Sequence, residues 1–296
     1  MASRWLDQAA GLRQLLGGPS CRSVSFCGGR GESGTTSLII NLAAALFERS
    51  RDVLVLDEFD GASNISQRLH LQPRFHFEQV LRREATLADA VLESGCGFQL
   101  LPLSARSHLL ATLNLREQDL LASELEELTC QSDWLLLDTR PGMGHRLPGL
   151  GLTSDDVVIV LSNRAESLTD AYATIKLLAS ECGRHDFRIL VNRVADLEAA
   201  SALFCRIRQV ARQYLGEAIR LRLIGFVPES EALHRATRQG QSVLAAFPHS
   251  DAAMAFRQLA DAMLRWTPPR RQAESPAGLV SQLIESSRIL TERLKH

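Results

Sequence analysis

A glycine-rich stretch at residues 28–37 carries the residue types and the spacing that bind phosphate groups. It lies between a short apolar run, residues 24–26, and a run with the composition of a helix, residues 38–47. A strand, a glycine loop and a helix in this order turn backbone N–H groups and a helix amino end toward an anion. The layout therefore predicts a phosphate-binding loop.

One residue that this chemistry normally needs is missing. Gly29 and Gly34 have the spacing of the glycines in the P-loop pattern G-x-x-x-x-G-K-[ST], and Thr36 supplies the hydroxyl. The lysine position holds Thr35. The scaffold of the loop is present, but its central positive charge is not.

The same glycines allow two other interpretations. Gly29, Gly31 and Gly34 fit the dinucleotide fingerprint G-x-G-x-x-G, with Asp57 as the ribose-binding acid. A nicotinamide-dependent enzyme is therefore an alternative, although the sequence shows no constellation of His, Lys or Tyr residues for hydride transfer. The third interpretation is a tight turn that binds no ligand.

Acidic residues end two of the apolar runs. Asp57 directly follows residues 53–56, and Asp138 follows residues 134–137. Since the carboxyl ends of parallel strands meet at one edge of a sheet, both should lie beside the glycine loop. Carboxylates there hold Mg²⁺ directly or through water, so the predicted metal ligands are Asp57, Asp138 and Thr36.

Apolar runs alternate with helical segments along most of the chain, which predicts an α/β fold. The predicted sheet is mostly parallel with helices on both faces. Its strands are expected at residues 24–26, 53–56, 98–102, 134–137, 157–161, 187–191 and 223–227. Asn192 and Pro228 follow the last two runs and are expected at the same edge as the loop.

Four segments are predicted from composition. They are a short N-terminal helix at residues 1–18, a main domain at residues 21–266, a proline-rich linker at residues 267–276 and an amphipathic helix at residues 277–296. The first segment is too short to be stable alone in water, so it is expected to fold on a partner, with packing on its own domain as the alternative.

The composition excludes several classes of function. The formal net charge of -1 gives no reason to expect direct nucleic-acid binding, and the aromatic content of 5% argues against a base-stacking surface. The six cysteines show no metal-binding spacing. With neither a signal peptide nor a membrane-spanning run recognisable, a cytoplasmic location is expected.

Several motifs resemble the MinD/ParA group of deviant-Walker ATPases. The loop is similar to K-G-G-x-G-K-T-T followed by N-L-A, which places Arg30 at the first lysine and Thr35 at the second. Residues 56–64 are similar to L-D-A-D-x-G-x-x-N, and residues 138–144 to D-T-x-x-G-x-G. The resemblance implies a MinD-like P-loop fold and nucleotide binding by Gly29, Arg30, Gly31, Gly34, Thr35, Thr36, Ser37, Asn192, Arg193 and Pro228.

Two further motifs resemble the FlhG family, also called FleN, MotR or YlxH, whose members control flagellar number. Residues 167–176 are similar to S-I-T-D-A-Y-A-x-I-K, and residues 7–13 fit D-Q-A-x-x-L-R. The second motif implies binding to the flagellar GTPase FlhF, and stimulation of its GTP hydrolysis, by Asp7, Gln8, Ala9, Leu12 and Arg13. Other partners that the resemblance implies are C-ring proteins or a flagellar transcription activator, and a second copy of the chain.

The departures from this family predict a pseudo-ATPase. Thr35 replaces the loop lysine, Phe59 replaces the second aspartate of L-D-A-D, and Glu32 adds a negative charge inside the loop. Binding of ATP or ADP with Mg²⁺ is therefore expected to be weak, and hydrolysis weak or absent. The alternative is an active MinD-like switch with ATP-dependent dimerisation.

The C-terminal amphipathic helix has two interpretations. Relatives use such a helix to bind membrane, which implies a polar, peripheral location at the inner face of the plasma membrane. Here the helix is only weakly basic and contains no Trp or Phe, so its membrane affinity should be modest. Packing on its own domain is the alternative. A paralogue that serves another polar machine, such as cellulose secretion or pili, also stays open.

Overall fold

The computed structural model describes residues 21–29, 33–58, 64–103, 113–139 and 154–267. Its strands are β1 (Arg22–Gly28), β2 (Val53–Asp57), β3 (Leu92–Glu93), β4 (Gln99–Pro102), β5 (Trp134–Asp138), β6 (Asp156–Ser162), β7 (Asp186–Val194) and β8 (Arg220–Pro228). Its helices are α2 (Thr35–Phe47), α3 (Ile65–Arg68), α4 (Phe77–Leu81), α5 (Leu115–Cys130), α6 (Ala165–Cys182), α7 (Leu197–Leu215), α8 (Glu231–Arg238), α9 (Val243–Ala246) and α10 (Asp251–Leu264), with a 3-10 turn at Ala88–Ala90. The two predicted terminal helices lie outside the described residues.

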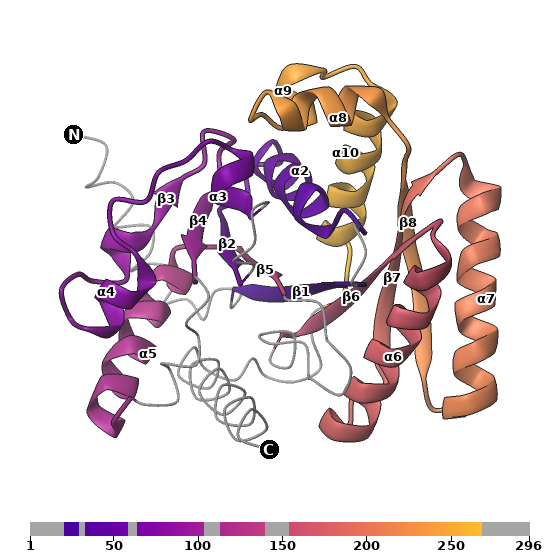
Figure 1. Ribbon diagram of the computed structural model, residues 1–296, viewed down its shortest axis with the longest axis horizontal. Coiled ribbons are helices and arrows are strands. Elements are labelled where there is room, and N and C mark those ends of the chain that lie inside the picture. The colour runs from indigo at the N-terminus through magenta and orange to yellow at the C-terminus, as the bar shows by residue number, and fades with distance from the viewer. Residues whose placement is uncertain (1–20, 30–32, 59–63, 104–112, 140–153, 268–296) are drawn as a thin grey trace.

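The strands form one sheet in the order β3-β4-β2-β5-β1-β6-β7-β8 (Figure 1). Every neighbouring pair is parallel except β3 with β4. All seven predicted strands are present, and the predicted α/β class is confirmed.

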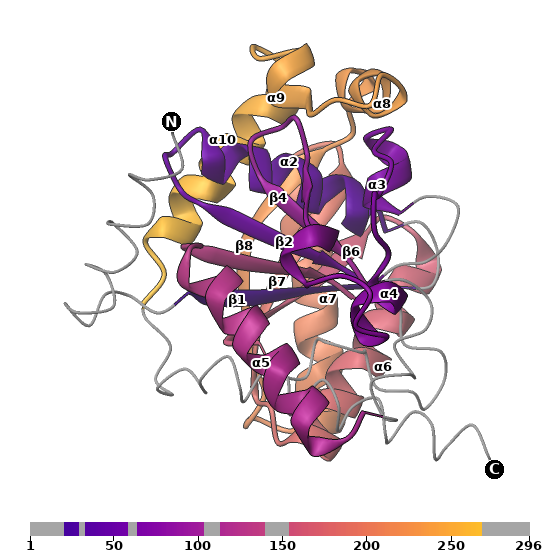
Figure 2. The same ribbon diagram turned by 90° about the vertical axis from the view of Figure 1, so that its left-hand side faces the viewer.

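Helices cover both faces of the sheet, because alternate strand residues supply two separate apolar surfaces. Val24 and Phe26 of β1 face a core shared with α2 and α10. Cys27 of the same strand faces the opposite core, which α6 and α7 complete. Figures 1 and 2 show these two layers on either side of the sheet.

Helix α2 is the central buried helix of the first layer. It contains ten buried residues and begins at Thr35, three residues before the predicted start. Asn41, the asparagine of the N-L-A motif, is 2% exposed. Its Nδ2 donates to the Ser37 carbonyl at 2.7 Å, and its Oδ1 accepts from the Val243 N–H at 2.6 Å. This one side chain therefore fixes α9 against the helix that follows the glycine loop.

A cluster of arginine and tryptophan side chains lies at the amino edge of the sheet, where β1, β6 and β7 begin. The Arg188 guanidinium lies 3.7 Å from the centre of the Trp266 ring. Arg22 donates to the carbonyls of Trp266 and Thr267 at 3.0 and 2.8 Å. Both arginines also pair with Asp156, at 2.7 Å each. The residues after α10 are thereby held to the amino ends of β1, β6 and β7.

Among the described residues, no helix is long and apolar enough to cross a membrane. The predicted limits of the main domain, residues 21–266, enclose every element above and stay a prediction.

Candidate functional site

The glycine loop joins the end of β1 to the start of α2 at the carboxyl edge of the sheet. Gly34 takes a left-handed φ of +77°, and a Cβ there would lie 2.5 Å from the Asn192 Nδ2. A side chain at this position would therefore meet both backbone strain and a clash. Arg30, Gly31 and Glu32 lie outside the described residues, so their predicted roles stay predictions.

Thr35, at the position of the P-loop lysine, points back into the base of the loop. Its side chain is 8% exposed, and its hydroxyl lies 2.8 Å from the Ser33 Oγ. A Cβ on Gly28 would come within 2.2 Å of both hydroxyls, so the chain needs glycine there too. A short, uncharged side chain held in this way does not replace a lysine ammonium that reaches across phosphates.

Asp57 and Asp138 occupy paired positions at the ends of β2 and β5, as the sequence predicted. Both carboxyl groups are buried, at 2% exposure. The Asp57 Oδ2 accepts from the Ile65 N–H at 2.8 Å. Thr36 hydrogen-bonds to the Asp138 carboxyl, whose Oδ2 is buried without a hydrogen-bond partner.

Burial and the neighbouring charge of Asp57 raise the pKa of Asp138 to about 8, while Thr36 and Arg68 act in the opposite direction. A buried, unpartnered carboxyl oxygen next to a second carboxylate is favourable only when a proton or a cation neutralises it. Asp57, Asp138 and Thr36 therefore suit Mg²⁺, which P-loop sites hold by one hydroxyl, the phosphates and water.

Asn192, Arg193 and Pro228 lie at the ends of β7 and β8, at the same edge. The Asn192 Nδ2 donates to the carbonyl of Ser33 at 2.8 Å, so this amide supports the loop. Arg193 has a left-handed φ of +58°, and its side chain lies near Gly34. Contact of these residues with an adenine ring stays a prediction.

Two residues at the site were not assigned a role from the sequence. Asp170, from the S-x-T-D-A-Y motif on α6, packs so closely on the loop that a Cβ on Gly29 would lie 2.8 Å from its carboxylate. Arg68, at the end of α3, donates from Nη1 to the Ser37 Oγ at 2.9 Å. A resemblance to family motifs could have drawn attention to Asp170. No sequence pattern marks Arg68.

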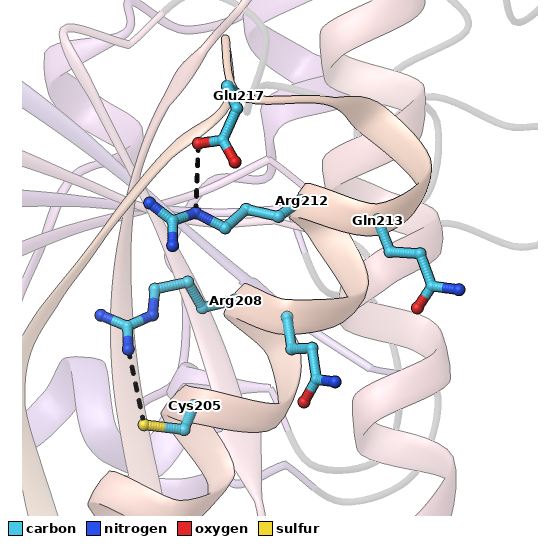
Figure 3. A pocket seen from close by; sticks show the side chains of 6 residues that line it. Cys205, Arg208, Arg212, Gln213 and Glu217 are labelled. Carbon is cyan, nitrogen blue, oxygen red and sulfur yellow. Dashed lines mark hydrogen bonds and ion pairs between the residues drawn. The ribbon is translucent and has the colours of Figure 1, made fainter.

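A separate hollow lies on the outer surface of α7, lined by Cys205, Arg208, Gln209, Arg212, Gln213 and Glu217 (Figure 3). Arg212 pairs with Glu217 at 3.3 Å, and Arg208 lies near the Cys205 sulfur. None of the predicted site residues lines it. Phe59 and the partner-binding residues Asp7, Gln8, Ala9, Leu12 and Arg13 lie outside the described residues.

Comparison with known proteins identifies the relatives of this chain. Antiactivator FleN of Pseudomonas aeruginosa is 28% identical over 88% of this chain and 93% of its own length. Flagellum site-determining protein YlxH of Helicobacter pylori is 26% identical over 73% of this chain and 72% of its own. The structure of septum site-determining protein MinD with Mg-ADP, from Pyrococcus horikoshii, has a TM-score of 0.61 at 22% identity and covers 83% of this chain and 96% of that one.

These similarities confirm the resemblance to the FlhG and MinD/ParA proteins and the MinD-like P-loop fold. Residues 21–264 match the model of a family described as "Cellulose biosynthesis protein BcsQ". This chain therefore belongs to the BcsQ family, and its fold is similar to that of MinD.

Proposed function

We propose that this chain regulates the number or placement of polar flagella and hydrolyses ATP weakly or not at all. The proposal of weak or absent hydrolysis rests on the conformation of Thr35. Its hydroxyl is hydrogen-bonded within the loop, at the position where relatives have a lysine. The proposed role in flagellar number or placement is supported by similarity to FleN over 88% of the chain and to YlxH.

The regulator acts on an FlhF-type GTPase through the helix at residues 7–13. Residues 7–13 precede the glycine loop in the sequence and share no residue with it, so this contact does not require the nucleotide site. Asp7, Gln8 and Arg13 make the polar contacts, and Ala9 and Leu12 make the apolar ones. The catalytic event is GTP hydrolysis by the partner, and this chain supplies the activating segment. C-ring proteins or a flagellar transcription activator bind other surfaces, and a second copy of the chain is a further partner.

The direct test measures GTP hydrolysis by the FlhF-type protein of the same organism, alone and with the full chain. Stimulation should be lost in a variant with Asp7→Ala, Gln8→Ala and Arg13→Ala. It should be kept in Gln14→Ala, a matched change in the same segment but outside the motif. Equal stimulation by both variants would refute the role of the helix.

ATP hydrolysis is tested separately, under single-turnover conditions with Mg²⁺. The native chain should release phosphate far more slowly than an ordinary MinD-like relative, or not at all. Turnover comparable to that of an ordinary MinD-like relative would refute the pseudo-ATPase assignment. That result would support the alternative function, an active ATPase switch with ATP-dependent dimerisation and binding to the inner face of the plasma membrane.

The family match supports a second candidate, regulation of cellulose secretion, because the family model is described by that process. Deletion of the gene distinguishes the two candidates. A changed number of flagella per cell with normal cellulose export supports the first. Lost cellulose with normal flagellation supports the second.

A further inference from the structure

The outer surface of α7 carries an excess of positive charge. Between Glu198 and Glu217 the chain contains three arginines and no acidic residue. Two of these arginines, Arg208 and Arg212, line the hollow on this helix (Figure 3). Arg212 pairs with Glu217 at 3.3 Å, but both side chains are more than half exposed, so water screens the pair. Arg208 lies near the Cys205 sulfur and forms no ion pair within the described part of the chain.

The hollow is suited to a partner that combines negative charge with a small apolar side chain. Its volume is about 520 Å³. The Cys205 sulfur and the carbon stems of the two arginines give its lining an apolar part, while the guanidinium groups add charge.

Helix α5 has the complementary composition. It contains five acidic residues against one basic residue, Arg116. Asp119, Glu126 and Glu127 are exposed, and among the described residues none of the three forms an ion pair. Leu120 is 48% exposed, and Glu127 follows it by two helical turns on the same face. The outer face of α5 therefore presents an apolar side chain among carboxylates.

The two helices lie at opposite ends of one layer. Helix α5 packs against β2, β4 and β5, whereas α7 packs against β6 and β7. These strands lie toward opposite ends of the sheet order, and Figures 1 and 2 show the helices well apart. One copy cannot bring its own α5 to its own α7, but two copies can bring one of each together.

The other parts of the chain do not supply an acidic partner for α7. A net positive charge is shared by the four longer segments outside the described residues, which are 1–20, 104–112, 140–153 and 268–296. The two shorter segments, 30–32 and 59–63, contain one acidic residue each. A basic segment of the same chain on the face of α5 is the competing arrangement, and it would block the contact between copies.

We propose that a second copy of the chain places the acidic outer face of its α5 on the hollow of α7. Leu120 enters the hollow, and the carboxylates of Glu126 and Glu127 face the arginines, which sets the orientation of the contact. The contact is head-to-tail, so it leaves one α5 and one α7 free and lets further copies add. It uses neither the glycine loop nor residues 7–13, and it does not depend on the flagellar role.

Sedimentation velocity of the full chain without nucleotide tests this over a range of micromolar concentrations. In about 50 mM salt the weight-average sedimentation coefficient should rise with concentration and should not level off at the value of a dimer. In about 500 mM salt the rise should be much smaller, because exposed charges are screened.

Two charge-reversal variants identify the faces. An α7 variant carries Arg208→Glu with Arg212→Glu, and an α5 variant carries Glu126→Lys with Glu127→Lys. Each should associate with itself at least about 10-fold more weakly than the native chain, since opposed charges become like charges. The matched control is Arg235→Glu with Arg238→Glu, two exposed positions on α8 in the other layer, and it should associate like the native chain.

An equimolar mixture of the α7 and α5 variants should associate again. The acidic α5 of the first variant meets the unchanged α7 of the second, and the two reversed faces also match each other. Recovery in the mixture is a result that loss of folding in either variant could not produce.

Three results would overturn the proposal. The first is a native chain that sediments as a monomer at every concentration in low salt. The second is association that stops at a dimer, which would indicate a symmetric contact. The third is a mixture that stays monomeric although thermal unfolding shows both variants folded, or a control that loses association as fully as they do.

Discussion

Replacement of Asp138 by asparagine should stabilise the folded chain, and the gain should grow with pH. The Asp138 carboxyl is 2% exposed and lies beside Asp57, and its Oδ2 has no hydrogen-bond partner. Its pKa rises in the folded state from 3.8 to about 8, chiefly because of burial and then because of Asp57. Asparagine has nearly the same shape and never ionises.

Proton binding determines the direction in which the stability of the folded chain changes with pH. Between pH 4 and pH 8 the unfolded chain has released this proton and the folded chain still holds it, so folded wild type loses stability as pH rises through that window. One pKa unit corresponds to about 1.4 kcal/mol, so the loss between pH 5 and pH 8 has a ceiling of about 4 kcal/mol. The Asp138→Asn variant is free of this loss, and local relaxation reduces the expected gain to roughly 2 kcal/mol.

The assay is urea unfolding at pH 5, 6, 7 and 8 in EDTA, so that no divalent cation occupies the site. The difference in free energy of unfolding between Asp138→Asn and wild type should increase steadily toward pH 8. Asp119→Asn, an exposed change on α5, should show no such trend. A difference for Asp138→Asn that is constant from pH 5 to pH 8 would refute the reasoning.

Three further changes test the frame around the site by chemical denaturation. Gly34→Ala should lower the free energy of unfolding by more than about 2 kcal/mol, because strain at positive φ adds to a clash at 2.5 Å. Its control is Gly183→Ala, with φ +61° and open space around it, which should lower that free energy by only about 1 kcal/mol. Asn41→Ala should cost about 2 kcal/mol, because the Val243 N–H is left buried without its acceptor, and a cost below about 0.5 kcal/mol would contradict that role. Trp266→Ala should cost about 2 kcal/mol through lost packing and the lost arginine contact, and an unchanged unfolding midpoint would contradict it.

The strand ends show what the sequence could predict. Near-continuous apolar runs that end in a polar residue allow few interpretations, so Asp57 and Asp138 were placed correctly on one edge, and they lie in register. The start of α2 was predicted three residues late, because apolar periodicity does not mark a first turn made of Thr35, Thr36 and Ser37. A two-residue strand such as β3 leaves no pattern at all.

The parts of the site that the sequence did not predict depend on contacts between segments that are far apart in the chain. Arg68 follows the loop by about thirty residues and lies in a helix of four residues, too short to show periodicity. Nothing local indicates that its side chain reaches Ser37. Asn192 was expected beside a ligand, yet its amide is bonded to the loop itself, a use that only the pairing of distant segments reveals.

The arginine and tryptophan cluster at the amino edge determines where any later segment begins. Thr267 is tied to Arg22, the first residue of β1, while the loop follows Gly28 at the other end of that strand. A strand of seven residues spans roughly 20 Å, at about 3.3 Å per residue. A dye or tether attached at residue 267 itself therefore lies at the far side of the sheet from the glycine loop. A label at this position can report on assembly, and a tether there can be used to apply force to the domain, while the glycine loop stays accessible.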